Sequence, residues 1–256
     1  MTQDGDTGFA GTSVFLTGAT SGIGRVTATR FLAAGANVAC VGRQSVELDR
    51  LVAEFGPRCL PLAADLADPG AIEPLAAQAI ERFGKIDVLV NGAGVGFRAD
   101  VLQTTPEQWA ETFAVNVTAA FLLCRAFLPH FLEHGAGTIV NVSSVGGLIG
   151  IPNRAAYCAS KAALISLTRS LTVEFAERGI RANCVAPGTT DTPWVDRILT
   201  GADDVATLRR QMEERQVIRR LGRPEEIADA IVFLASPRAS FFHGSIVVVD
   251  GGYTAR

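Results

Sequence analysis

Tyr157 and Lys161 are the pair of residues whose types and spacing most directly suggest chemistry in this sequence. A separation of four residues places both side chains on one face of a helix, one turn apart. A phenol has a reference pKa of about 10, but a neighbouring ammonium group stabilises the phenolate and lowers that pKa. Ser144, thirteen residues before Tyr157, adds a hydroxyl group. The three residues predict a proton-transfer site, whereas the pair alone is more often part of an ordinary amphipathic helix.

A glycine-rich segment near the start of the chain contains Gly18, Gly22 and Gly24. The apolar stretch 13–16 precedes it, and residues 25–32 follow with the apolar periodicity of a helix. A strand, a glycine turn and a helix place backbone N–H groups where they bind the pyrophosphate of a dinucleotide. The spacing Gly-x-x-x-Gly-x-Gly differs from the general G-x-G-x-x-G fingerprint, so the segment gains its weight from the Tyr-x-x-x-Lys pair further along the chain.

Together the two motifs resemble those of the short-chain dehydrogenase/reductase family, and the resemblance extends over roughly residues 11–252. Other segments match the family's elements in the family's order: Asn91-Gly92-Ala93-Gly94 after the fourth strand, Asn116 in a helix, Ile139–Ser144 in the fifth strand, Pro187–Thr192 after the sixth strand, and Val249–Gly252 near the C-terminus. So many motifs in one order leave little room for chance.

Strands alternate with helices along the chain, which predicts a parallel sheet covered on both faces. With the resemblance, this indicates an α/β fold: a flexible N-terminus at 1–10, then a single doubly wound Rossmann domain at 11–256 with a seven-stranded parallel sheet and helices on both faces. The expected strands are 13–17, 37–41, 59–63, 88–91, 138–142, 181–186 and 245–249. Helices are expected at 68–83, 106–132, 154–178, 202–216 and 224–235 and in a segment ending at 34, with 188–201 a loop within a lid at about 188–216.

The catalytic residues that the resemblance implies are Asn116, Ser144, Tyr157 and Lys161. Tyr157 would be the general acid in reduction and the general base in oxidation, with Lys161 lowering its pKa. Ser144 would hydrogen-bond the substrate oxygen, and Asn116 would hold a water that relays protons, although Asn116 alone also suits a buried structural amide. No metal is expected, because the histidines at 130, 134 and 243 form no ligand-spaced cluster.

A nicotinamide dinucleotide is the expected cofactor, and its phosphate preference depends on the end of the second strand. The acid that binds an unphosphorylated ribose is expected about 20 residues after the glycine motif, where this chain has Gly42 followed by Arg43. The sequence therefore predicts NADP(H) as the preferred cofactor. NAD(H) is the alternative, because Thr20 and Ser21 lack the basic residue of many NADP-preferring relatives and Arg43 could instead stack on the adenine.

By resemblance, the cofactor-binding residues are Gly18, Thr20, Ser21, Gly22, Ile23, Gly24, Arg43, Asp65, Leu66, Asn91, Ala93, Gly94, Tyr157, Lys161, Pro187, Gly188, Thr190 and Thr192. Asp65 would bind the adenine and Asn91 would line the cofactor, and Lys161 would also hold the nicotinamide ribose. Asp65 taken alone suits a turn equally well.

The substrate is expected to contact Val95, Gly146, Asn153 and Trp194, although Trp194 would equally serve as a packing anchor of the lid. The stretch 187–195 resembles that of aldose dehydrogenases of the L-fucose type, which favours a sugar or small polar alcohol. The alternative is a 3-oxoacyl carrier-protein reductase, but residues 131–137 lack the Lys or Arg that would dock an acidic carrier. An alternative from another class is a dinucleotide-binding sensor without catalysis.

Composition bounds the partners and the compartment. The net charge is −3, which gives no general attraction to nucleic acid or to an anionic membrane. The acidic, polar N-terminus is no signal peptide, no apolar run approaches the length of a membrane span, and the five cysteines include no CxxC pair. We expect a cytoplasmic enzyme with a small-molecule substrate, and the resemblance implies a homo-oligomer, either a tetramer or a dimer.

Overall fold

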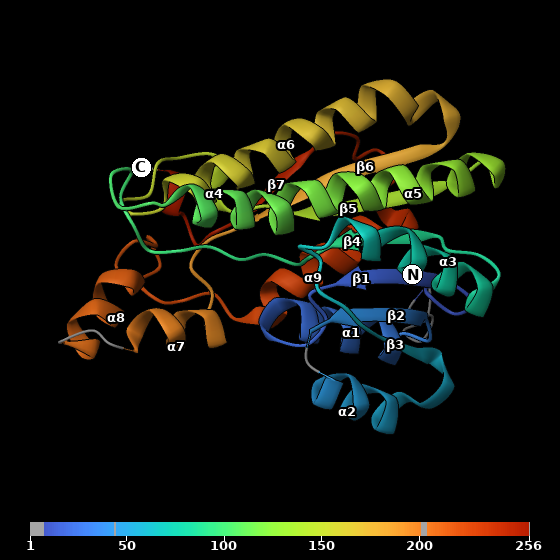
Figure 1. The fold of residues 1–256 in the computed structure, drawn as a ribbon, viewed down its shortest axis with the longest axis horizontal. Coiled ribbons are helices and arrows are strands. Elements are labelled where there is room, and N and C mark those ends of the chain that lie inside the picture. The colour runs from blue at the N-terminus through green and yellow to red at the C-terminus, as the bar shows by residue number, and fades with distance from the viewer. Residues whose placement is uncertain (1–7, 44, 201–203, 256) are drawn as a thin grey trace, which may run out of the picture.

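Seven parallel strands form one continuous sheet at the centre of the computed structural model (Figure 1). The structure describes residues 8–43, 45–200 and 204–255. The strands are β1 Ser13–Thr17, β2 Asn37–Gly42, β3 Cys59–Ala63, β4 Val88–Asn91, β5 Gly137–Val142, β6 Ile180–Pro187 and β7 Ile246–Val249. Their order in the sheet is β3-β2-β1-β4-β5-β6-β7. The predicted fold class is confirmed, and the chain crosses from one half of the sheet to the other between β3 and β4.

The central strands are apolar on both sides because helices cover both faces of the sheet. In β1, Val14 and Leu16 belong to one buried cluster and Phe15 to the other. This alternation follows from the two-residue period of a strand. A parallel sheet of this kind brings the carboxyl ends of all its strands to one edge, and there the site residues gather.

Two layers of helices pack on the sheet (Figure 1). One face carries α1 Gly22–Ala33, α2 Ser45–Phe55 and α9 Pro224–Ala235, and the other carries α3 Ile72–Phe83, α5 Ala119–Glu133 and α6 Ala155–Phe175. Helix α2 was not predicted. It buries Leu48 and Leu51 against the sheet, while Val46 on the same helix is largely exposed.

The predicted long helix from Pro106 is divided into α4 Pro106–Phe113, a π-helical segment Ala114–Thr118 and α5. Thr105 caps its start, since its hydroxyl accepts from the N–H of Gln108 and the Gln108 side chain accepts from the N–H of Thr105. By length and composition alone this helix could cross a membrane. It is a core helix here, because α5 buries an apolar face against α3 and the sheet.

The region predicted as loop at 188–201 contains a further helix, α7 Pro193–Leu199. Pro193 occupies the first helical turn, where its missing N–H does no harm. Together with α8 Val205–Glu213 it forms a small lobe with its own apolar core, made by Val195, Leu199, Met212 and Leu221. Residues 202 and 203 of the expected helix 202–216 lie outside the described residues, as do residue 201 of the expected loop and residues 1–7 of the expected flexible N-terminus. Phe9 is buried edge-on against Phe31.

Candidate active site

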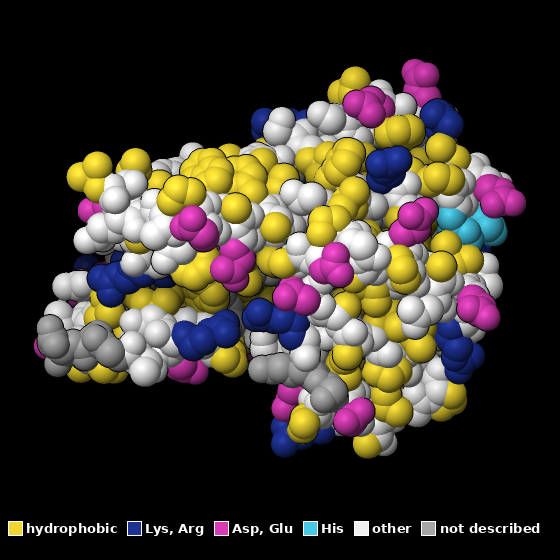
Figure 2. Space-filling view, in the orientation of Figure 1, with side chains coloured by type: hydrophobic (Ala, Val, Ile, Leu, Met, Phe, Trp, Pro, Cys, Tyr) yellow, Lys and Arg dark blue, Asp and Glu magenta, His cyan; other side chains and the backbone are white. Residues whose placement is uncertain are grey.

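A cleft of about 360 Å³ lies at the carboxyl ends of the strands, beneath the lobe of α7 and α8. Figure 2 shows the hollow between this lobe and the rest of the molecule. Motifs far apart in the sequence meet there: the cleft is lined by Gly18, Ser21–Gly24, Gly92–Gly94, Ser144, Tyr157, Lys161, Pro187–Thr190, Thr192 and Trp194, among others. The sheet therefore brings the glycine-rich segment and the Ser–Tyr–Lys residues to one place.

Two glycines of the glycine-rich turn, Gly18 and Gly24, have no room for a side chain. Gly18 has a φ of +77°, and a Cβ there would lie 2.9 Å from the carbonyl oxygen of Gly92. A Cβ on Gly24 would lie 2.0 Å from the carbonyl oxygen of Gly18. The Thr17 hydroxyl ties the two loops together by accepting from the N–H groups of Gly92 and Ala93, both at 3.1 Å. The backbone of the turn therefore forms a bare, fixed wall of the cleft.

The N-terminus of α1 opens onto this wall and suits an anion. Ser21 is its N-cap residue, but no side chain of the described residues caps the helix there, and its first turn holds no acidic residue. The first N–H groups of a helix carry a partial positive charge that favours phosphate. The turn and the helix end together fit the pyrophosphate of a dinucleotide, which Ser21, Gly22 and Ile23 would hold.

Tyr157, Lys161 and Ser144 meet on the opposite wall. Both Tyr157 and Lys161 lie on α6, and the Lys161 Nζ is 5.7 Å from the centre of the Tyr157 ring. The Lys161 Nζ donates to the carbonyl oxygen of Val142 at 2.9 Å, and Lys161 is 4% exposed. Ser144 follows β5, and its Oγ accepts from the N–H of Gly146 at 3.1 Å. The Ser144 hydroxyl also forms a hydrogen bond with Tyr157, so its hydrogen is directed at the phenol oxygen.

Burial sets the proton affinities of the two titratable groups. It raises the pKa of Tyr157, while the hydrogen bond with Ser144 and the charge of Arg154 act in the lowering direction. Burial lowers the pKa of Lys161 to about 8. The sequence predicted a lowered Tyr157 pKa through Lys161, and the direction in the structure is the opposite because loss of water around the phenol outweighs the nearby charges. Tyr157 therefore carries its proton at neutral pH.

Asn116 lies in the π-helical segment and is buried beside the same wall. Its Nδ2 donates to the carbonyl oxygen of Val95 at 2.9 Å and to the Ser160 Oγ at 2.9 Å, and its Oδ1 accepts from the N–H of Val95 at 2.8 Å. Both amide hydrogens are therefore engaged within the protein. The side chain fixes the loop after β4, and the predicted water-holding role of Asn116 stays a prediction.

Several predicted cofactor and substrate residues lie apart from the cleft lining. The Asn91 side chain turns into the sheet, where its Nδ2 donates to the Asn141 Oδ1 at 2.8 Å. Asp65 is exposed after β3, and its Oδ1 accepts from the N–H of Ala67, as in a turn. The other residues of this group are Thr20, Arg43, Leu66, Val95 and Gly146, whereas Asn153 and Trp194 do line the cleft. The prediction that Asn91 lines the cofactor thus conflicts with the direction of its side chain.

At the end of β2, the Thr20 side chain occupies the space beside Gly42. A Cβ on Gly42 would lie 2.3 Å from the Thr20 Cγ2 atom. A carboxylate at this position would require Thr20 to move, and the next residue is the exposed Arg43. The nearest acid on α2, Glu47, is held by Arg25 at 2.7 Å. The charge available at this corner is therefore positive.

Four arginines of the cleft were missed by the sequence analysis. Arg98, Arg154, Arg197 and Arg215 line its substrate side, near Trp194. The Trp194 ring stacks at 25° to the Tyr157 ring, with 6.3 Å between ring centres. The arginines come from four separate segments of the chain, so no local spacing could have revealed them; Arg154 stood in the sequence only as the start of the catalytic helix.

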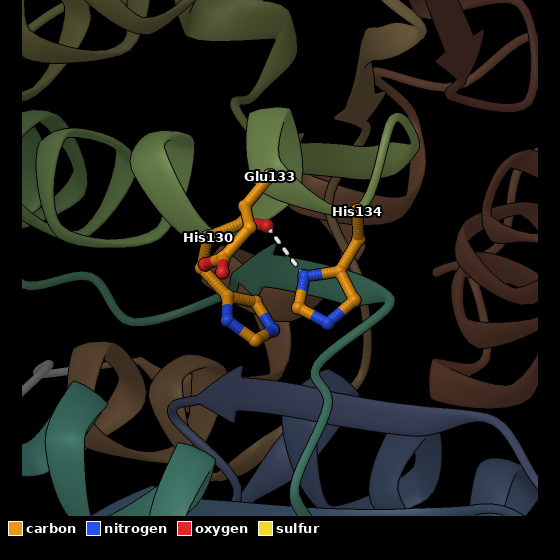
Figure 3. Close-up of side chains that lie close together, drawn as sticks. All are labelled: His130, Glu133 and His134. Atoms are coloured by element: carbon orange, nitrogen blue, oxygen red, sulfur yellow. Dashed lines mark hydrogen bonds between the residues drawn. The ribbon is translucent and has the colours of Figure 1, made fainter.

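A separate cluster of possible metal donors lies at the C-terminal end of α5, outside the cleft (Figure 3). The sequence predicted no ligand-spaced cluster of histidines, but the donor atoms of His130, Glu133 and His134 lie within 4.8 Å of one another. The His130 Nε2 accepts from the N–H of Ile86 at 3.1 Å, so its Nδ1 carries the proton in the neutral ring. His130 then has no lone pair left for an ion, and the cluster supports no metal assignment.

Comparisons with known proteins agree with the geometry of the cleft. The family model described as Enoyl-(Acyl carrier protein) reductase matches residues 18–254. A 2-(R)-hydroxypropyl-CoM dehydrogenase from Xanthobacter autotrophicus is 43% identical over 94% of this chain and 97% of that protein. A cis-4-hydroxycyclohexanecarboxylate dehydrogenase from Sinomonas cyclohexanicum is 41% identical over 96% of this chain and 98% of that protein.

A solved structure from Beutenbergia cavernae, described as an NAD(P)-dependent gluconate 5-dehydrogenase, contains NADP at low occupancy. It is 37% identical, covers 98% of this chain and 100% of its own, and superposes with a TM-score of 0.89. The chain is also similar to a 2-keto-3-deoxy-L-fuconate dehydrogenase from Xanthomonas campestris (36% identity) and to a 3-oxoacyl-[acyl-carrier-protein] reductase from Thermotoga maritima (35% identity). Both resemblances noted in the sequence are therefore confirmed.

Proposed function

The chain belongs to the short-chain dehydrogenase/reductase family of NAD(P)-dependent oxidoreductases, and we propose that it interconverts a small polar secondary alcohol and its ketone. The observation that carries this proposal is the meeting of Ser144, Tyr157 and Lys161 with the glycine-rich turn in one cleft. A bound nicotinamide supplies or accepts the hydride, and the residues of the chain orient the substrate and manage the proton.

Each of the three residues has a distinct part in the proposed reaction. The Ser144 hydroxyl turns its hydrogen from Tyr157 to the substrate oxygen and stabilises negative charge that develops on it. Tyr157, protonated at neutral pH, gives its proton to that oxygen in reduction and takes it back in oxidation. Lys161 is a buried cation between Val142 and the phenol ring and favours the phenolate once the proton has left.

For the cofactor we propose a preference for NADP(H) over NAD(H). The position of the usual acid is Gly42, and the Thr20 side chain fills the adjacent space, so no carboxylate would repel a 2′-phosphate. Arg43 supplies a guanidinium at that corner. A guanidinium binds a phosphate through paired hydrogen bonds.

For the substrate we propose a sugar or another small polar alcohol. Relatives named for hydroxylated acids, such as the cis-4-hydroxycyclohexanecarboxylate dehydrogenase, support this class. The alternative is a 3-oxoacyl carrier-protein reductase, to which the chain is also similar. Residues 131–137 contain no Lys or Arg that would dock an acidic carrier, which favours the small alcohol.

We also propose that the chain forms a homo-oligomer through its long helices. Apolar side chains are exposed on this face, among them Trp109 on α4, Phe121 on α5 and Val173 on α6. Figure 2 shows hydrophobic side chains gathered over α4 and α6. Contiguous exposed apolar surface favours association between chains. The cytoplasmic location rests on the sequence argument and stays a prediction.

A substrate screen with both cofactors tests the proposed function. The absorbance of the reduced nicotinamide is followed with aldoses, polyols, hydroxy acids, steroids and acetoacetyl thioesters. Turnover of a small polar alcohol, reduced in Trp194→Ala, supports the proposal. Efficient reduction of acetoacetyl thioesters with no turnover of any alcohol would assign the fatty-acid function instead. Tight cofactor binding with no turnover at all would favour the non-catalytic sensor.

A further inference from the structure

The substrate side of the cleft is strongly cationic, although the whole chain is slightly acidic. Arg98, Arg154, Arg197 and Arg215 line the cleft together with Lys161, and no Asp or Glu is among the described residues that line it. The net charge of the chain is −3, so this accumulation does not follow from composition. Figure 2 shows Lys and Arg side chains around the hollow below α4.

Trp194 gathers two of these arginines beside the reacting residues. The Cζ atoms of Arg154 and Arg197 lie 5.5 and 5.3 Å from the centre of the indole ring, within the range of a cation–π contact. The same ring stacks on Tyr157. The indole therefore fixes two guanidinium groups next to the phenol that moves the proton.

No carboxylate among the described residues forms an ion pair with Arg154. Its NH1 donates to the carbonyl oxygen of Phe97 at 3.2 Å, and the side chain is partly buried. Burial is the main cause that lowers the pKa of Arg154, and the charges of Arg98 and Arg215 also act in the lowering direction. Within residues 8–43, 45–200 and 204–255, no carboxylate forms a salt bridge with Arg98, Arg154 or Arg197. A desolvated cation without an acidic partner gains most from an anionic ligand.

We propose that the substrate carries an oxyanion, such as a carboxylate or a sulfonate, which binds Arg154 and Arg197 while its reacting oxygen lies at Ser144 and Tyr157. The inference rests on the proposed alcohol dehydrogenase function and narrows its substrate class from polar alcohols to hydroxy acids and oxo acids. Neutral aldoses offer hydroxyl groups to the arginines but leave their charge without a partner. A guanidinium pairs with two oxygens of an oxyanion through two parallel hydrogen bonds, which fixes the direction of the substrate as well as its affinity.

A binding measurement tests the anion site without requiring turnover. The probes are cyclohexanecarboxylate and cyclohexanesulfonate, with cyclohexanecarboxamide as the neutral isostere, titrated by calorimetry into protein saturated with NADPH. The two anions are expected to bind and the amide to bind at least about tenfold more weakly. Arg154→Met and Arg197→Met should each weaken the anions by about 10- to 100-fold and leave the amide within about threefold. Arg169→Met, an exposed position on α6 outside the cleft lining, should change nothing.

Kinetics on a matched pair separates this proposal from the proposed function. Oxidation of 3-hydroxybutanoate and of its methyl ester is compared in the same variants, with Arg154→Lys as the conservative replacement. Arg197→Met should raise KM for the acid more than it lowers kcat, and leave the ester nearly unchanged. Arg154→Lys should recover part of the affinity lost in Arg154→Met, because lysine keeps the positive charge. It should not recover all of it, because lysine lacks the paired N–H donors of the guanidinium.

Three results would overturn the anion site. Equal binding of carboxylate and amide would show that the charge is not recognised. Equal losses for acid and ester in Arg197→Met would show a packing role instead. A loss of NADPH affinity as large as the loss for the probes would assign the arginines to the cofactor. If no alcohol is turned over but the probes bind in an arginine-dependent way, the proposed function fails and the anion site stands.

Discussion

The two sides of the cleft present different chemical groups, backbone on one side and large side chains on the other. The side formed by the glycine-rich turn consists mainly of backbone groups, held in place by contacts such as the Thr17 hydroxyl with the N–H groups of Gly92 and Ala93. The other side consists of large side chains, Trp194 with Arg154 and Arg197 around it. A backbone wall recognises what all dinucleotides share. A side-chain wall recognises what distinguishes one substrate from another.

The two sides also differ in how they are anchored. The turn joins β1, an interior strand of the sheet, to α1, and both contribute to a large buried cluster. Trp194 and Arg197 lie on α7, a seven-residue helix whose lobe has a core of its own with few members. A small separate core allows the lobe to move relative to the sheet at a modest free-energy cost. The difference indicates a rigid cofactor side and an adaptable substrate side.

The largest expected effect is at Tyr157, which is the proposed acid and base and stacks on Trp194. Tyr157→Phe should lower kcat by about 10²–10⁴-fold, because the phenol is the proposed acid and base, and should leave cofactor affinity within a few-fold. Tyr253→Phe is the matched control, since Tyr253 is the other tyrosine of the chain and is not among the residues lining the cleft. Steady-state kinetics gives kcat and cofactor titration gives the affinity for both variants. If Tyr157→Phe kept more than about a tenth of the wild-type kcat, the assigned role would be wrong.

The rigidity of the cofactor side is tested by adding one methyl group. Alanine favours a helix over glycine by about 1 kcal/mol, yet a Cβ at Gly24 in α1 would lie 2.0 Å from the Gly18 carbonyl oxygen. Gly24→Ala should therefore lower the free energy of unfolding by about 1–3 kcal/mol and weaken NADPH binding. Gly150→Ala is the control, because nothing lies within 4 Å of a Cβ there. Urea unfolding and cofactor titration provide the measurements. If Gly24→Ala left the free energy of unfolding and the NADPH affinity unchanged, the backbone of the turn would have to shift without cost to accommodate the methyl group.

What the sequence could predict follows the same division. The glycines and the Ser144–Tyr157–Lys161 set are local patterns, and strands β1, β3 and β4 begin and end where hydrophobic runs predicted them. Helix α7 was missed because residues 188–192 are rich in turn-forming types and the helix itself has only seven residues. The arginines were missed because only the fold brings them together. The direction of the Asn91 side chain could not be predicted, because at a strand end it depends on the neighbour across the sheet, here Asn141, and the cofactor role of Asn91 stays a prediction.

The direction of the Tyr157 pKa gives a pH dependence that differs between the two reactions. Because burial raises this pKa, the phenol is protonated at neutral pH. The rate of alcohol oxidation should therefore rise with pH, by up to about tenfold per unit, until the phenolate dominates. Ketone reduction needs the protonated phenol and should stay flat through neutral pH. It should fall above about pH 8, where Lys161 loses its proton.

Ser144→Ala sharpens this test, because the Ser144 hydrogen bond lowers the pKa of Tyr157. The variant should shift the oxidation profile to higher pH, whatever its effect on the maximal rate. Initial rates of kcat/KM in both directions across neutral and alkaline pH provide the measurement. A plateau already reached at neutral pH, or a shift of the variant to lower pH, would contradict the assignment.

The smallest expected effect is at Arg43, which follows β2. On the cofactor side this is a place where a side chain, and not the backbone, is proposed to recognise the cofactor. Arg43→Ala should weaken NADPH binding by about three- to tenfold and NADH binding hardly at all, because only NADPH offers a phosphate to the guanidinium. The effect is modest because Arg43 is exposed and water screens the pair. Arg30→Ala, an exposed arginine of α1 paired with Asp229, is the control for a change of net charge. Calorimetric titration of both cofactors, repeated at higher salt, should show the Arg43 effect shrink. Equal losses for the two cofactors, or a wild-type preference for NADH, would remove the NADP(H) proposal and leave Arg43 stacked on the adenine that both cofactors share.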